Sequence, residues 1–311
     1  MYRWLNILFL ILTPLVSWAE PVKELPWSFT SLDELPPPKT QKTSWAHNRV
    51  DHFVLSRMEP KGLQPAPAAG DRVLLRRLYF DLIGLPPTPK QLADFRNRAK
   101  ANRKTAIKKE IDSLLASPHY GERWARHWLD LARYTDKTAS WLNSTASAWR
   151  YRDWVVQALN QDLPYNEFIK QQLANDLIAG SDPKNNAALG YLGLSPTYWK
   201  ELQLPPEIIK TTVADEWEER MDAVGRTFLG LTLGCARCHD HKFEPVTQAD
   251  YYAIAGVFAS VRIADRPMVK QELWAPVAKA REQVAKLEKK LTELKKKKPT
   301  TLKAGKGVKT P

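Results

Sequence analysis

The sequence has only two cysteines in 311 residues and no long uninterrupted apolar run. Its most apolar stretch, Leu5 to Val16, contains Pro14 and falls short of the roughly 20 residues that a membrane-spanning helix needs. It also lacks any extended segment in which apolar and polar residues alternate, the pattern of a half-buried strand. These absences argue against an integral membrane protein and against a fold built on sheets.

The residues that are present predict an all-α fold. Hydrophobic residues make up 43% of the chain and include 12 Trp, which is enough to form a core and excludes disorder throughout. Apolar residues recur at spacings of three and four, which is typical of amphipathic helices. The pattern predicts a Pro-rich linker at 20–44, a multi-helix domain at 45–265, a coiled-coil-like helix at 272–298 and a basic disordered tail at 299–311.

Several helix boundaries carry local sequence marks. Asp71 is expected to cap one helix, and Ser117 followed by Pro118 is expected to open another. The apolar stripe of that second helix would consist of Trp124, His127, Trp128 and Leu131. The longest helix is expected to carry Val213, Trp217, Val224, Phe228 and Leu231 and to end at Gly234.

A heptad pattern marks the helix near the C-terminus. Its seam follows alternating spacings of three and four through Val277, Ala280, Val284, Leu287, Leu291 and Leu294. At about two and a half heptads the seam is short for a self-sufficient coiled coil. We expect this helix either to pack on a partner helix or to fray.

The N-terminus has the features of a secretory signal peptide at 1–19. Arg3 supplies a positive charge, Leu5 to Val16 an apolar core, and Ser17-Trp18-Ala19 a cleavage site between small residues. The mature chain would begin at Glu20, in the periplasm or at the cell surface. The alternative is a buried N-terminal helix.

The net charge of +13 is concentrated near the C-terminus. Residues 279–311 contain 12 Lys or Arg and three Glu, a net of +9, which leaves +4 for the rest of the chain. On an exported protein such a tail suits an anionic glycan, a cell-surface polymer or anionic lipid better than a nucleic acid. The alternative is a solvated, disordered end.

The two cysteines stand in the motif Cys235-Ala236-Arg237-Cys238-His239. With this chain's own residue frequencies, C-x-x-C-H is expected by chance only about 2 × 10⁻⁴ times. Covalent haem attachment explains it, because two thiols spaced three apart can each join a vinyl group of one porphyrin, and His239 is then the proximal iron ligand. Attachment of this kind follows export, in agreement with the predicted signal peptide.

Three alternatives compete with haem c. Cys235 and Cys238 could form a disulfide, stay as two buried thiols, or join His241 in a site for zinc or another non-haem metal. His241 is too near His239 to bind the opposite face of one haem. The distal position is either open or filled by Met221, Met268, His127 or His119. His127 and Met221 can also be read as core residues.

A second group of residues combines arginine, tryptophan and carboxylates. Its cations are Arg123, Arg126, Arg133, Arg150 and Arg152, interleaved with Trp124, Trp128, Trp149 and Trp154. Such a set suits haem propionates or anionic glycans, although it also describes a polar helix face with arginine stems packed on tryptophan. Asp130, Asp136, Asp153 and Glu122 are candidates for acid and base roles in glycan chemistry.

Four segments resemble one known family. They are SPHYGERWARHWLDLARY, WRYRDWV, DLPYNEFIKQQLANDL and GRTFLGLTLGCARCHDHKFEPVTQADYYAIAGVF. They are similar to the planctomycete PSCyt-type domain, a secreted, cytochrome-associated domain of unknown function, over about Trp45 to Val261. The resemblance implies an exported helical protein with haem residues Cys235, Cys238 and His239, and with His241 in the family's CHDH pattern.

Relatives of this type often carry a cytochrome c-like module in front and a second domain behind. This chain shows neither, so a stand-alone minimal form or a shortened gene product is expected. The function that we expect is an exported c-type haem protein, an electron-transfer or redox component that serves complex carbohydrate metabolism and works with a redox partner protein. The alternative is a non-haem metal-binding or glycan-binding helical module in which C-x-x-C-H is structural.

Overall fold

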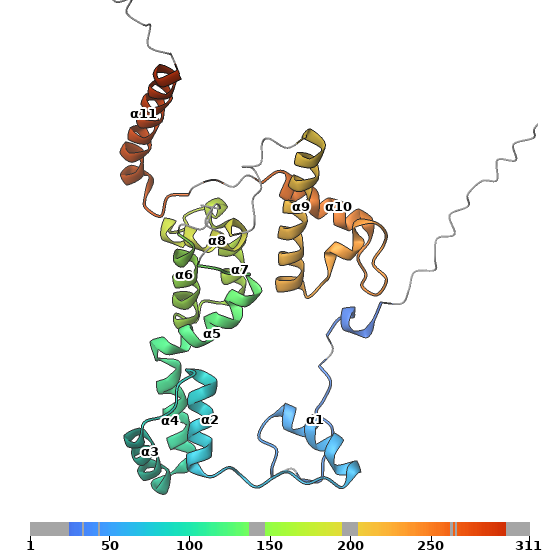
Figure 1. Ribbon diagram of the computed structural model, residues 1–311. Coiled ribbons are helices and arrows are strands. Elements are labelled where there is room, and N and C mark those ends of the chain that lie inside the picture. The colour runs from blue at the N-terminus through green and yellow to red at the C-terminus, as the bar shows by residue number, and fades with distance from the viewer. Residues whose placement is uncertain are drawn as a thin grey trace, which may run out of the picture. The chain divides into compact units, whose positions relative to one another are not determined.

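The computed structural model describes residues 25–296, except residues 33, 43, 137–146, 195–204, 262–263 and 265. These residues form eleven α-helices and no strand, which confirms the all-α prediction (Figure 1). No helix among them is long and apolar enough to cross a membrane. The expected signal peptide at 1–19 and the expected tail at 299–311 lie outside the described residues.

The chain divides into two compact units, with the boundary in the sequence between Ala68 and Ala69. The first unit contains α1 (Arg49–Met58), whose start is closed by a capping box between Asn48 and Asp51. The second unit contains all the other α-helices. The limits predicted at residues 45 and 265 come from sequence patterns and stay predictions.

The second unit begins with α2 (Asp71–Leu82), α3 (Pro89–Ala101) and α4 (Arg103–Leu115). Their shared core consists of Leu75, Tyr79, Phe95, Ala106 and Leu114. The predicted capping role of Asp71 is wrong, because Gly70 holds the N-cap position and Asp71 is the first helical residue. The Asp71 carboxylate instead accepts a hydrogen bond of 3.0 Å from Arg103 Nε, which ties the start of α2 to α4.

The next cluster joins α5 (Pro118–Leu131), α6 (Ala148–Asn160), α7 (Tyr165–Ala174) and the short α8 (Gly190–Gly193). Ser117 caps α5 as predicted. The expected buried stripe of α5 is wrong for three of its four members, because Trp124, His127 and Leu131 are exposed. Gly121 and Ala125 are buried instead, since α6 packs closely on the side of α5 that carries small residues.

The third cluster joins α9 (Pro206–Val224), the 3₁₀ helix η7 (Leu233–Arg237) and α10 (Gln248–Ala259). Its buried residues are Met221, Leu233, Ala236, Val246, Tyr251 and Phe258. Between α9 and η7 the chain makes a π-helical turn, η6 (Gly225–Leu229), which ends at Gly230 in the left-handed region with φ of 67°. The helix therefore ends before Gly234, the predicted end, because Gly230 in the left-handed region turns the chain back toward η7.

The last helix, α11 (Gln271–Lys296), has 26 residues and no buried residue. It confirms the C-terminal helix, and it is longer than α9, which has 19 residues. The expectation that the helix before the cysteines would be the longest is therefore wrong. The regular helix of that segment ends after 19 residues, because the chain passes into the π-helical turn η6 and then into the left-handed Gly230.

Candidate functional site

The two cysteines lie on η7 and directly after it. Side chains three residues apart on a 3₁₀ helix project from the same side. Cys235 and Cys238 are accordingly both exposed, and both are free of disulfide bonding. Leu233 and Ala236 form the opposite side, where they are 2% and 0% exposed in the core with α9 and α10. The turn therefore exposes both thiols on one side, while Leu233 and Ala236 hold its other side in the core.

Polar contacts attach the same turn to its two neighbouring helices. Arg237 pairs with Glu218 on α9, and the negative charge of Glu218 raises the pKa of Arg237. From α10, Gln248 Nε2 donates to the main-chain oxygen of Arg237 at 3.1 Å, and Gln248 N donates to Asp240 Oδ1 at 2.8 Å. The backbone around the motif is thus held on both sides.

His239 is exposed and uses one ring nitrogen within the chain. Its Nδ1 lies 2.7 Å from the main-chain oxygen of Asp240. Because a carbonyl oxygen can only accept, Nδ1 must carry the proton and donate it. The Nε2 atom then keeps its lone pair, which is the arrangement that a metal-ligating histidine usually has.

His241 shows the opposite tautomer. Its side chain is 7% exposed, and Nδ1 accepts hydrogen bonds from the main-chain N–H groups of Phe243 and Glu244, at 3.1 and 2.8 Å. Nδ1 is therefore unprotonated, and Nε2–H donates to Thr232 Oγ1 at 2.9 Å.

Thr232 and Glu244 complete this arrangement around His241. Glu244 accepts from both Thr232 Oγ1 and Thr232 N, at 3.0 and 2.8 Å. The network of Thr232, His241 and Glu244 closes the loop that contains the motif. Sequence reasoning missed Thr232, because nothing local to it indicates a partner nine residues later.

This network bears on the alternative metal site. Both ring nitrogens of His241 are occupied by bonds within the loop, so a metal ion could bind the ring only at the expense of one of them. Among the described residues, no group of three or more His, Cys, Asp and Glu side chains is arranged to hold a metal ion.

The candidate distal ligands lie in different surroundings. Met221 is fully buried beneath the motif with Leu233 and Ala236, which agrees with its core interpretation. Met268 packs on the α5–α8 cluster. His119 Nδ1 lies 2.7 Å from Glu122. The core interpretation of His127 is wrong, because its ring is exposed and lies on α5 with its centroid 5.6 Å from that of Trp124.

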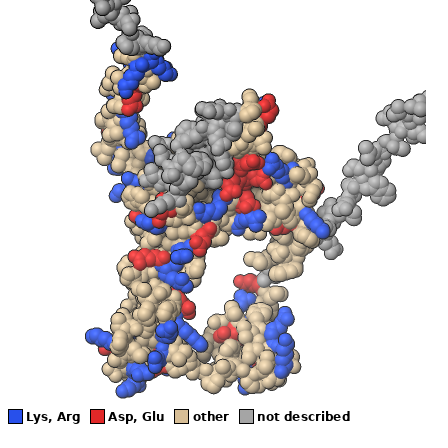
Figure 2. Space-filling view, in the orientation of Figure 1, with Lys and Arg blue, Asp and Glu red and all other residues tan. Residues whose placement is uncertain are grey.

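A hollow of about 500 Å³ adjoins Cys235 on the side of α9. Its lining includes four acidic residues on one face of that helix, Asp215, Glu218, Glu219 and Asp222. Figure 2 shows acidic side chains gathered over α9. Arginines neutralise much of this face, since Arg237 pairs with Glu218 and Arg226 pairs with Asp222 at 2.7 Å.

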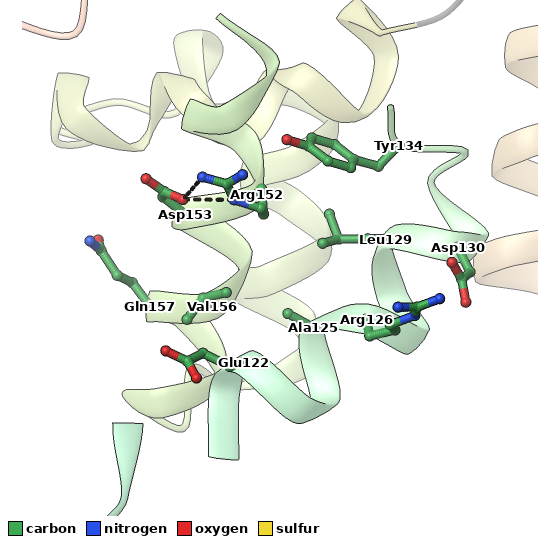
Figure 3. Close-up of a pocket in the computed structure, with 10 residues that line it drawn as sticks. All are labelled: Glu122, Ala125, Arg126, Leu129, Asp130, Tyr134, Arg152, Asp153, Val156 and Gln157. Atoms are coloured by element: carbon green, nitrogen blue, oxygen red, sulfur yellow. Dashed lines mark hydrogen bonds and ion pairs between the residues drawn. The ribbon is translucent and has the colours of Figure 1, made fainter. Parts of the chain in front are cut away.

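A larger pocket, of about 600 Å³, lies between α5 and α6. It brings together three of the four carboxylates that the sequence singled out, Glu122, Asp130 and Asp153, with the cations Arg126 and Arg152. In Figure 3, Glu122, Asp153 and Gln157 line one side, Arg126 and Asp130 line the other, and Ala125, Leu129 and Val156 lie between them. Arg123, Arg133 and Arg150 do not line this pocket.

The polar groups of this pocket divide into paired and unpaired ones. Arg152 donates to Asp153 Oδ1 from Nε at 3.0 Å and from Nη2 at 2.9 Å, and burial raises the pKa of the nearby Tyr134 to about 12. Within the described part of the chain, the side chains of Arg126, Asp130 and Gln157 make no ion pair or hydrogen bond. Gln157 was missed in the sequence, although it follows Asp153 by one helical turn.

Comparison with known proteins identifies one family. The matching family model is PSCyt2, described as a protein of unknown function (DUF1549), and it covers residues 49–263. No curated protein and no solved structure matches the chain.

Proposed function

The chain belongs to the PSCyt2 family, and on that premise we propose that it is an exported c-type haem protein that carries electrons. The observation that carries the proposal is the exposure of all three residues of the C-x-x-C-H motif. Cys235 and Cys238 project together from an anchored 3₁₀ turn, and His239 next to them has a ring nitrogen with a free lone pair.

The donor set fits a covalently attached haem. The two thiols on one side of η7 would form the thioether links, and Nε2 of His239 would bind the iron. When bound, the haem supplies one-electron chemistry. The hydrogen bond from His239 Nδ1 to the oxygen of Asp240 orients the ring and makes Nε2 a better donor.

The rest of the loop supports haem over a non-haem metal. A zinc site would need His241, but both of its ring nitrogens already form hydrogen bonds within the loop. The exposure of the two cysteines and of His239 leaves the motif accessible to a redox partner protein. Export to the periplasm or cell surface is part of the same proposal, since the thioether links form after export.

The test uses the full chain matured in the periplasm of a host that attaches haem c. We expect a haem-stained band on a denaturing gel, and we expect Cys235→Ala combined with Cys238→Ala to remove it. His47→Ala, which alters an exposed histidine in the segment before α1, serves as the control and keeps the stain. A parent protein without covalent haem, or a double variant that retains it, would reject the proposal.

The α5–α6 pocket favours a second candidate function, the binding of an anionic glycan. Arg126, Asp130 and Gln157, which have no partner among the described residues, can bind hydroxyl and acidic groups of a sugar. Ala125, Leu129 and Val156 offer apolar contact to its ring. This is the site through which a role in complex carbohydrate metabolism would act.

Calorimetric titration with uronic-acid and neutral oligosaccharides tests this candidate. Arg126→Ala should weaken binding of the acidic sugar about tenfold, because a hydrogen bond to a charged group is lost. Arg96→Ala, an exposed arginine on α3, is the matched control and should change nothing. If neither sugar binds, or if both variants behave alike, the pocket is not a glycan site.

A further inference from the structure

The apolar seam of α11 has no cover among the described residues. Five of its side chains are about half exposed: Val277 45%, Val284 52%, Leu287 66%, Leu291 52% and Leu294 55%. Charged residues on the opposite face pair with one another, as Lys286 does with Glu282 at 2.7 Å. A continuous apolar stripe on an otherwise charged helix is typical of a helix that packs against another.

We propose that the seam packs against α11 of a second copy of this chain, in an antiparallel coiled coil. In that arrangement the two apolar heptad positions face each other across the interface. The alignment that overlaps the whole seam pairs Val277 with Leu294, Val284 with Leu287, and Leu291 with Ala280 of the second copy. By symmetry each pair occurs twice.

Side-chain volume favours this direction over a parallel one. A parallel, in-register pair would place Ala280 opposite Ala280 and leave a gap between layers of larger residues. The antiparallel alignment sets Ala280 against Leu291, so that every layer contains a leucine. Alternation of large and small residues across an interface fills space more evenly.

Charge complementarity favours it as well. The residues that flank the seam on one side are Trp274, Arg281, Glu288 and Lys295, and antiparallel helices bring this side of each copy together. Arg281 then meets Glu288, and Lys295 meets Trp274, whose ring already holds Arg281 of its own chain at 5.1 Å. A parallel pair would instead place Lys290 beside Lys295 and form no pair of opposite charge.

Sedimentation equilibrium of the full chain, from sub-micromolar to sub-millimolar concentration, tests the proposal. We expect a reversible dimer. Arg281→Glu, which opposes two carboxylates at two symmetric contacts, should weaken the dimer about tenfold or more. Adding Glu288→Arg to that variant should restore dimerisation, because the two charges have exchanged places.

The control variant is Lys289→Glu, which makes the same change of charge on the opposite face of α11 and should leave the dimer intact. Circular dichroism of each variant confirms that the helix forms. A chain that stays monomeric at every concentration overturns the proposal. So does a dimer that is insensitive to Arg281→Glu, or one that the double exchange fails to restore.

Discussion

At the scale of single residues, main-chain contacts give His239 and His241 opposite tautomers and so different roles. His239 Nδ1–H donates a hydrogen bond to the main-chain oxygen of Asp240, which leaves Nε2 for a ligand. His241 accepts two main-chain N–H groups at Nδ1 and so is committed to the loop. We infer that His241 is a positioning residue for the motif, acting through the backbone and not through iron.

The first prediction is that His241→Ala retains covalent haem but lowers the free energy of unfolding by about 1–3 kcal/mol, because the main-chain N–H groups of Phe243 and Glu244 lose their acceptor and Thr232 loses its donor. His241→Asn, whose side-chain oxygen can replace Nδ1 as the acceptor, should recover part of the loss. Haem staining and urea denaturation measure the two effects. Since loss of the network destabilises the loop even without a metal, metal content and not stability separates this interpretation from a zinc site. Zinc in a parent protein without haem, and its loss from His241→Ala, would contradict it.

At the scale of elements, the close contact of α5 and α6 creates the second candidate site. Gly121 N–H donates to Asn160 Oδ1 at 2.7 Å, and a Cβ atom at Gly121 would lie 2.4 Å from the main-chain oxygen of Val156. The absence of a side chain at Gly121 is what permits this approach. The same approach gathers Glu122 and Arg126 on α5 and Arg152 and Asp153 on α6 around one pocket.

The second prediction compares two glycines in helices. Gly121→Ala should destabilise the protein by about 1–3 kcal/mol, because the backbone of α6 would have to shift. Gly256→Ala on α10, where a Cβ would meet nothing within 4 Å, should instead stabilise it by about 0.5–1 kcal/mol. Thermal unfolding of both variants provides the measurement. Equal effects at the two positions would show that the α5–α6 contact is not as tight as described.

At the scale of the whole molecule, charge is distributed unevenly. Residues 279–311 hold a net charge of +9, most of the total of +13. Because α11 has no buried residue, this segment contributes no described contact to the core of the helical domain. Its charge is therefore available to an anionic partner, as the sequence suggested.

The third prediction is that deletion of residues 279–311 weakens binding to vesicles that contain anionic lipid, or to an anionic polymer, without a change in the thermal unfolding of the helical domain. Raising the salt concentration should weaken binding of the full chain more than that of the truncated one. Deletion of residues 297–311 alone removes five lysines but keeps the whole seam, and should give an intermediate loss. A large fall in unfolding temperature would mean that α11 belongs to the core.

The sequence by itself determined the properties that depend on neighbouring residues. Helical periodicity predicted an all-α fold, and Ser117 and Pro118 marked the start of α5. The spacing of Cys235, Cys238 and His239 favoured covalent haem attachment over three alternatives, which stays a prediction. Caps, periodicity and motifs of this kind act within one or two helical turns, so they can be read without knowledge of the fold.

Only the tertiary structure decided which faces and partners are used. It paired Asp71 with Arg103, buried Gly121 in place of Trp124, and joined Thr232 to His241 and Glu244. It also gathered Glu122, Asp130 and Asp153 around one pocket, although they come from two helices. These contacts depend on how closely whole helices and loops pack, and packing is a property of residues distant in the chain.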